Sequence, residues 1–182
     1  QFLIASRGNW QVIEQFLKET PAEKRPQAMA LLDVISAKDL RDISLEVLTD
    51  HLNNTPAVDS PLFDRYVMNP RVSTEFITPY KQFFAANFDA EVAKKAQADP
   101  QVLGDWVKQN ITLNDDLNPQ RIAIMPMGVW KSRVADVNSR NIFFVSVARS
   151  LGIPARIEPV ARKIQYAKDN AWVDVVFEAA AP

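Results

Sequence analysis

Residues 141–156 read NIFFVSVARSLGIPAR, and this stretch decides the fold of the chain. Apolar side chains lie on nearly every side of its first ten residues, which is typical of a buried helix rather than a surface helix. Ser139 is a suitable N-cap in front of it, Gly152 is a suitable residue just past its end, and Pro154 cannot continue it. The sequence therefore predicts a central buried helix that ends near residue 151.

The residues that follow this helix predict strands. Residues 156–166 read as one strand, in which Pro159 favours an edge position or a bulge. Lys168 to Asn170 is a turn candidate, and Ala171 to Glu178 alternates as a half-buried strand. The final residues 179–182, AAAP, read as a linker. A buried helix followed by antiparallel strands predicts the α+β class.

Helical patterns dominate the chain before this region. A helix is expected after Asn9, and another from residues 36–39 to Leu52 that carries His51 at the edge of its apolar stripe. The composition becomes polar and rich in turn residues near residue 113. We therefore expect a helical lobe at 1–112 and a core at 113–182 that is truncated at its C-terminus.

Composition excludes several classes of function. The chain has 182 residues, of which 47% are hydrophobic and 24% charged, with a net charge of −1. This is a globular mix with no apolar run long enough for a membrane span and no basic excess for nucleic acid. The absence of cysteine removes thiol nucleophiles and thiolate metal sites, and a single histidine removes multi-histidine metal sites. We expect no metal, no cofactor, no nucleic-acid partner and no membrane insertion.

Two motifs near the C-terminus resemble the transglutaminase-like superfamily. Residues 143–156, FFVSVARSLGIPAR, resemble the end of the family helix, written roughly C-x5-LFVALLRALGIPAR. Residues 170–175, NAWVDV, resemble the family strand HAWVEV. The resemblance implies a papain-like fold with a cysteine at the start of the buried helix, a histidine on a neighbouring strand and a carboxylate on the next strand.

The catalytic groups of the family are missing from this sequence. In the family register the cysteine position falls on Val137, the histidine position falls on Asn170, and the carboxylate position lies past Pro182. Neither side chain can perform the chemistry of the family residue at its position, because valine is inert and asparagine does not titrate near neutral pH. The resemblance therefore implies the fold and argues against the family chemistry. It also favours a longer bacterial protein that is secreted or periplasmic.

The leading hypothesis is a non-catalytic binding or structural module within a larger chain, with other domains of that chain as further partners. A polypeptide or a glycan is the expected ligand. An anionic ligand near Arg140 is a further possibility, because residues 131–170 are locally basic. The residues expected to line the ligand cleft are Trp130, Val137, Ser139, Arg140, Asn170 and Trp172.

Two other hypotheses remain open. One is a hydrolase or acyl-transfer enzyme in the same cleft that uses Asp136, Ser139 or Asp174, although these residues are also plausible as helix caps or surface groups. The other is a helical protein-interaction module in which residues 1–112 carry the function. His51 is expected to be a partly buried or surface residue without a catalytic role.

Overall fold

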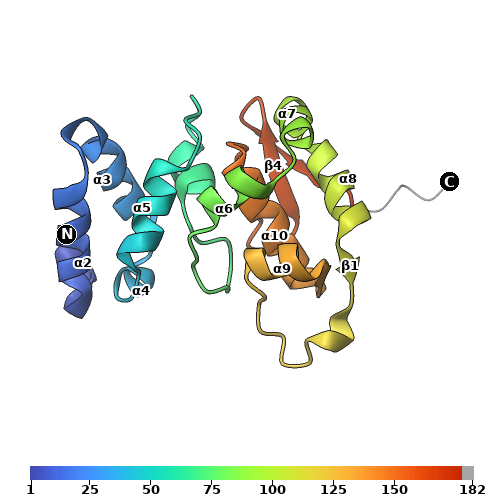
Figure 1. Cartoon of the computed structure of the whole chain (residues 1–182), viewed down its shortest axis with the longest axis horizontal. Coiled ribbons are helices and arrows are strands. Elements are labelled where there is room, and N and C mark those ends of the chain that lie inside the picture. Colours follow the sequence, from blue (N-terminus) through green and yellow to red (C-terminus); the bar gives the residue numbers. More distant parts are fainter. Residues whose placement is uncertain (178–182) are drawn as a thin grey trace.

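Apolar side chains collect into two clusters, whose buried members lie within residues 13–68 in one and 80–166 in the other. The computed structural model describes residues 1–177. The molecule is elongated, with the N-terminal helices at one end and the later helices and the larger sheet at the other (Figure 1). Among the described residues, no helix has both the length and the apolar character needed to cross a bilayer.

Short helices form the N-terminal part. They are α1 (Phe2–Ala5), α2 (Trp10–Glu19), α3 (Arg25–Val34), α4 (Ala37–Leu40) and α5 (Leu45–Asn53). The single helix expected from residues 36–39 to Leu52 is wrong, because two capping serines divide it into α4 and α5. Ser36 accepts the Asp39 N–H at the start of α4, and Ser44 accepts the Val47 N–H at the start of α5.

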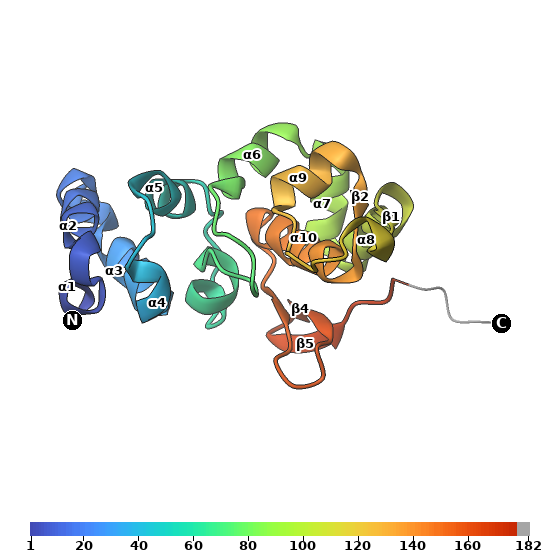
Figure 2. The ribbon, with the colours of Figure 1, turned by 90° about the horizontal axis from the view of Figure 1, so that it is seen from below.

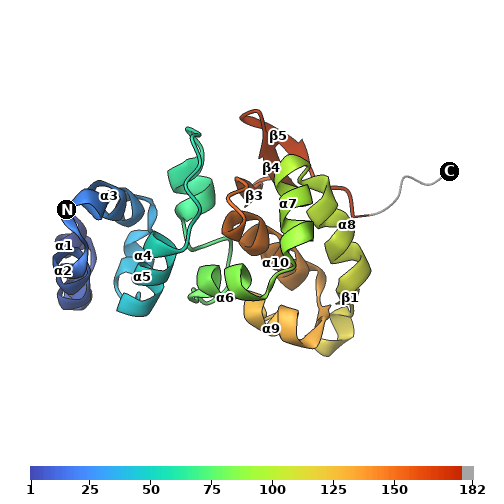
Figure 3. The same ribbon diagram turned by 45° about the horizontal axis from the view of Figure 1, so that its top comes forward.

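The buried central helix is confirmed as α10 (Val137–Ser150). Its apolar residues from Ile142 to Ala148 are fully buried. The helices that surround it are α6 (Tyr80–Asn87), α7 (Ala90–Ala98), α8 (Gln101–Asn110) and α9 (Pro126–Ser132) (Figures 2 and 3). A two-residue parallel pair, β1 (Thr112–Leu113) with β2 (Val134–Ala135), joins the end of α8 to the chain that enters α10.

Helices α6 to α8 share one hydrophobic cluster with α10, through residues such as Phe84, Leu103 and Val107. They belong to the 1–112 segment that the sequence assigns to the helical lobe. The change in packing partners falls within residues 68–80, where Met68 and Ile77 pack with the first cluster and Val72 and Tyr80 with the second. The boundary at residue 112 stays a prediction about which segments fold as units.

The larger sheet is antiparallel, as expected, and has the order β3 (Ala155–Ile157), β4 (Ile164–Lys168), β5 (Ala171–Asp174). The expectation of one strand over residues 156–166 is wrong. Pro159 has no N–H for a ladder, and the Glu158 carboxylate accepts the N–H groups of Val160 and Ala161, so a turn replaces the strand there. The predicted turn at residues 168–170 is confirmed between β4 and β5. Glu178 and the expected linker at residues 179–182 lie outside the described residues.

A buried arginine joins the two parts of the molecule. The Arg149 guanidinium at the end of α10 donates to the carbonyl of Ala155 and to the carbonyls of Asn69 and Arg71. Burial lowers the pKa of Arg149, and nearby groups such as Tyr80 and Glu75 partly offset that effect. On the same junction, the Asp50 carboxylate on α5 accepts the N–H groups of Lys81 and Gln82 in the first turn of α6.

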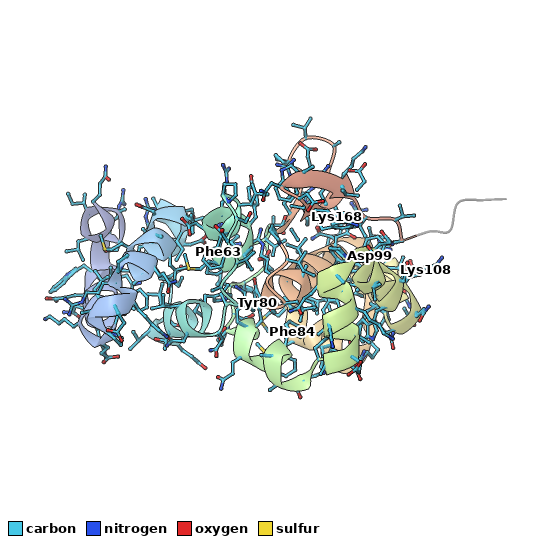
Figure 4. The ribbon with its side chains drawn as sticks, turned by 90° about the horizontal axis from the view of Figure 1, so that it is seen from above. Phe63, Tyr80, Phe84, Asp99, Lys108 and Lys168 are labelled. Atoms are coloured by element: carbon cyan, nitrogen blue, oxygen red, sulfur yellow. The ribbon has the colours of Figure 1, made fainter. Side chains whose placement is uncertain are left out.

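His51 lies in this junction and not near the start of α10. It is fully buried, its Nε2 lies 3.0 Å from the Thr78 carbonyl, and its ring meets the edge of Tyr80. Figure 4 shows Tyr80 and Phe84 on α6, between the N-terminal helices and α10. Burial, followed by the charge of Lys81, places the pKa of His51 well below its ordinary value. The expectation of a partly buried or surface histidine underestimated this burial.

Candidate functional site

A cavity of about 640 Å³ opens at the first turn of α10. Its walls are the loop after β1, including the helical turn η4 (Asp115–Leu117), and the hairpin between β3 and β4. Figure 1 shows this loop in yellow, extending away from the body between β1 and α9. The lining residues are Asp115, Asp116, Asn118, Pro119, Arg121, Asp136, Val137, Asn138, Asn141, Ile157 and Arg162.

Val137 lies at the first position of α10 and lines this cavity with 40% of its surface exposed. The position that the sequence resemblance aligns with the family nucleophile is therefore accessible. Its N–H donates to the Asp115 carboxylate at 3.0 Å. An isopropyl side chain at this position contributes apolar contact and has no group that can attack a substrate.

Asp136, and not Ser139, caps α10, so the expected cap is corrected by three residues. The Asp136 carboxylate accepts the Ser139 N–H at 3.2 Å. Ser139 is inside the first turn and fully buried, and its hydroxyl donates to Asp136 while it accepts the Ile124 N–H. An aspartate displaces serine as the cap because its charge also interacts favourably with the positive end of the helix.

Hydrogen bonds hold the Asp136 carboxylate in its ionised form. Burial opposes ionisation, but hydrogen bonds from Ser139 and Asn118 outweigh it and lower the pKa of Asp136 below its ordinary value. Asn118 Nδ2 lies 2.9 Å from Asp136 Oδ1. A carboxyl group with a lowered pKa does not hold a proton at neutral pH and is a weak base. Asp136 therefore acts as a structural cap that also fixes the loop at Asn118.

Asn170 does not reach the cavity. It lies in the turn between β4 and β5 with a φ of 61°, and its side chain accepts a hydrogen bond from Ser60 at 2.8 Å. The register explains this position, because Ile157 at the cavity pairs with Ile164, whereas Asn170 follows the pair of Lys168 with Ala171. Four residues separate these two pairs along β4, which is about 13 Å of strand. The structure does not bring Val137 and Asn170 together.

Asp174 and Trp172 lie on the outer face of the sheet, away from α10. Asp174 accepts hydrogen bonds from Lys163 at 2.7 Å and from Gln165 at 2.8 Å. These bonds, led by the one from Lys163, lower the pKa of Asp174. The Trp172 ring packs against Tyr66 and beneath the Arg156 guanidinium. Asp136 and Asp174 therefore do not form a carboxylate pair.

Trp130 and Arg140 also take up places other than the expected cleft wall. Trp130 stacks on Trp106 at 5.7 Å between ring centroids, beneath the Arg133 guanidinium. The Arg140 guanidinium lies 4.0 Å from the centre of the Phe177 ring and donates to Asn141. The polar loop at residues 115–121 and Arg162 supply much of the lining instead. In the sequence these residues carry only the signal of turn formation.

The described cavity residues offer hydrogen-bonding groups and charges, but their side chains are not arranged as a metal site. Within residues 1–177, no group of three or more histidine, cysteine, aspartate or glutamate side chains is arranged to hold a metal ion. Asp115 and Asp136 are already acceptors for N–H groups of the first turn of α10. What the arrangement can do is hold a polar ligand against a short apolar floor formed by Val137 and Ile157.

A buried helix on the inner face of an antiparallel sheet, with a cavity at the first turn of that helix, defines an α+β domain. The sequence profile of the transglutaminase-like superfamily matches residues 83–180, which is more than half of the chain. The chain therefore belongs to the transglutaminase-like superfamily. No curated protein and no solved structure matches it.

Proposed function

We propose that this protein is a non-catalytic member of its superfamily that binds a segment of polypeptide in the cavity at the start of α10. The observation that carries the proposal is which side chains surround the first turn of α10. Val137 occupies the nucleophile position and faces an open cavity of about 640 Å³, while the carboxylates of Asp115 and Asp136 accept the N–H groups of Val137 and Ser139. The cleft is thus kept and the reactive group is replaced.

The electrostatics of the helix start support a non-catalytic role. In a thiol enzyme, the free N–H groups and the dipole of such a helix stabilise a thiolate or a developing oxyanion. Here two carboxylates take up those N–H groups, so the cavity end of the helix does not favour a second negative charge. The oxygen-based alternative has little support, because Ser139 is fully buried and hydrogen bonds lower the pKa of Asp136.

The lining favours a polypeptide over a glycan. Asn138 and Asn141 offer amide groups that match the donors and acceptors of a peptide backbone, and Leu117 and Ile122 on the adjoining loop are 67% and 64% exposed. None of the eleven lining residues is aromatic, so no flat ring is available for a sugar face to rest on. A structural role without a ligand, and a contact with another domain of the same chain, are alternatives that the experiment separates from peptide binding.

The test is a titration of the ¹⁵N-labelled chain with a mixture of short blocked peptides, followed by amide shifts. We expect shifts at residues 136–141 and at the loop 115–122. Val137→Trp places a bulky ring at the first turn of α10 and weakens these shifts, whereas Val160→Trp, at an exposed position on the β3–β4 turn, leaves them intact. Shifts of undiminished size in Val137→Trp, or no shift with any peptide while a chito-oligosaccharide binds there, would contradict the proposal.

A second measurement addresses catalysis. The chain is incubated with a glutamine-containing peptide and a primary amine, and ammonia release is followed. We expect release at the rate of the buffer alone. Ammonia release above that rate which is lost in Asp136→Asn would instead support the oxygen-based enzyme.

A further inference from the structure

Three charged side chains of the cavity make no ion pair within residues 1–177. The guanidinium of Arg121 and the carboxylate of Asp116 have no hydrogen-bond or ion-pair partner there, and Arg162 donates only to the Ser73 hydroxyl at 3.2 Å. Lys163, the chain neighbour of Arg162, is paired instead, with Asp174 at 2.7 Å. Opposite charges that line one cavity without meeting each other are available to a ligand.

The two arginines reach the cavity from separate turns with an unusual backbone. Arg121 has a φ of 53° and Arg162 a φ of 59°, so both lie in the left-handed region that residues other than glycine rarely adopt. Arg121 belongs to the loop wall and Arg162 to the hairpin wall. Such conformations are kept where the surrounding structure enforces them, and they occur often at ligand clamps.

The charge of the whole lining excludes ligands of a single sign. The carboxylates of Asp115, Asp116 and Asp136 oppose a ligand that is only anionic, and the two arginines oppose one that is only cationic. A ligand that carries both signs satisfies both groups. Val137 and Ile157 in the lining add apolar contact for the aliphatic stems of long charged side chains.

We propose that the cavity selects a polypeptide segment in which an acidic and a basic side chain lie close together, the acidic one bound by Arg121 and Arg162 and the basic one by Asp116. This inference rests on the proposed function, because it names the class of peptide that the same cavity binds. It predicts a preference set by charge and not by size.

The experiment measures the affinity of the full chain for blocked peptides in which a glutamate and a lysine are separated by zero to three alanines. Three matched sets replace the glutamate, the lysine or both by glutamine. At the best spacing, we expect each charge to strengthen binding about fivefold, and added salt to remove most of this gain. Amide shifts at residues 136–141 confirm that binding takes place in the cavity.

Variants assign each charge to its partner. Arg162→Gln weakens binding of the glutamate-containing peptides and leaves those that already carry glutamine there unchanged, and Asp116→Asn does the same for lysine. The matched control is Lys163→Gln, next in the chain to Arg162 but bonded to Asp174 on the outer face, which leaves all affinities unchanged.

The outcomes separate the two proposals. Equal affinity of all four peptide sets at the cavity overturns the charge preference and leaves peptide binding in place. Equal loss in Arg162→Gln and Lys163→Gln also overturns it, because a general field effect would then explain the preference. The absence of any shift at residues 136–141 with every peptide overturns both.

Discussion

The two ends of α10 have diverged to different extents from the superfamily pattern. The C-terminal end keeps the run from Arg149 to Arg156 and lies buried at the junction of the molecule, where the Arg149 guanidinium donates to backbone carbonyls. The N-terminal end carries no cysteine and opens on a cavity with Val137 at the surface. The end that matches the family motif therefore holds the two parts of the molecule together, while the end that differs from the motif lies at an open cavity.

The largest expected effect is at the buried end. Arg149→Met removes the donors to the carbonyls of Asn69, Arg71 and Ala155 and leaves them buried without partners. We expect a loss of roughly 3–5 kcal/mol in the free energy of unfolding, measured by urea denaturation. Arg65→Met is the control, because it makes the same replacement at an exposed position. It changes stability by less than about 0.5 kcal/mol. A loss below about 1 kcal/mol for Arg149→Met would mean that the junction does not depend on this arginine.

The junction also predicts a pH effect through His51. Its folded pKa lies below the unfolded value, so the unfolded state binds more protons and stability falls as the pH falls below about 6.5. The slope is at most about 1.4 kcal/mol per pH unit until the folded pKa is reached. His51→Gln keeps a donor for the Thr78 carbonyl and flattens the dependence between pH 6.5 and 5. An unchanged slope in this variant assigns the pH dependence to other groups.

A smaller effect is expected at the open end. Asp136→Ala removes the cap of α10 and costs about 1 kcal/mol at pH 7. Because the folded pKa of Asp136 is lowered, its contribution is present above the unfolded pKa and disappears as the pH falls through the folded value. The difference between wild type and variant therefore shrinks below about pH 4. A difference that is the same at pH 7 and pH 3 would show that the charge of Asp136 contributes nothing.

The smallest expected effect is on the reactivity of a cysteine placed at the start of α10. Val137→Cys restores the family nucleophile, but the thiol then lies beside the carboxylate of Asp115, and no histidine lines the cavity. We expect a thiol pKa of about 8.5 or above, read from the pH dependence of alkylation, and no ammonia release from a glutamine peptide. A thiol pKa well below 7 would mean that the helix start still activates a nucleophile and would break the contrast between the two ends.

The motifs allowed the helix and its family to be predicted but misplaced several site residues. The apolar run at residues 142–148 identified the buried helix, since side chains that are apolar on all sides are typical of a central helix and Gly152 and Pro154 mark its end. The alignment of Asn170 with the family histidine did not predict its position, because Asn170 lies in the turn between β4 and β5, at the end of β4 opposite the pair of Ile157 with Ile164. Trp172 was correctly placed on a strand, but its ring lies on the outer face with Tyr66.

The lining of the cavity could not be predicted from the sequence at all. Asp115, Asn118 and Arg121 lie in a polar loop whose composition predicts turns and nothing else, and Arg162 lies in a turn some forty residues further on. Their proximity depends on the hydrogen bonds of Asp115 to Val137 and of Asn118 to Asp136. No local pattern encodes such contacts, because they join segments that are distant in the chain.

The sequence by itself determined the central helix, its end near Gly152, the α+β class and the absence of any cysteine. These properties depend on side-chain type and local spacing, which the sequence states directly. Only the tertiary structure decided that Arg149 joins the two parts, and that two arginines and three aspartates share one cavity. The physical reason is that burial and pairing of charges depend on which distant segments pack together, and that is a property of the folded chain as a whole.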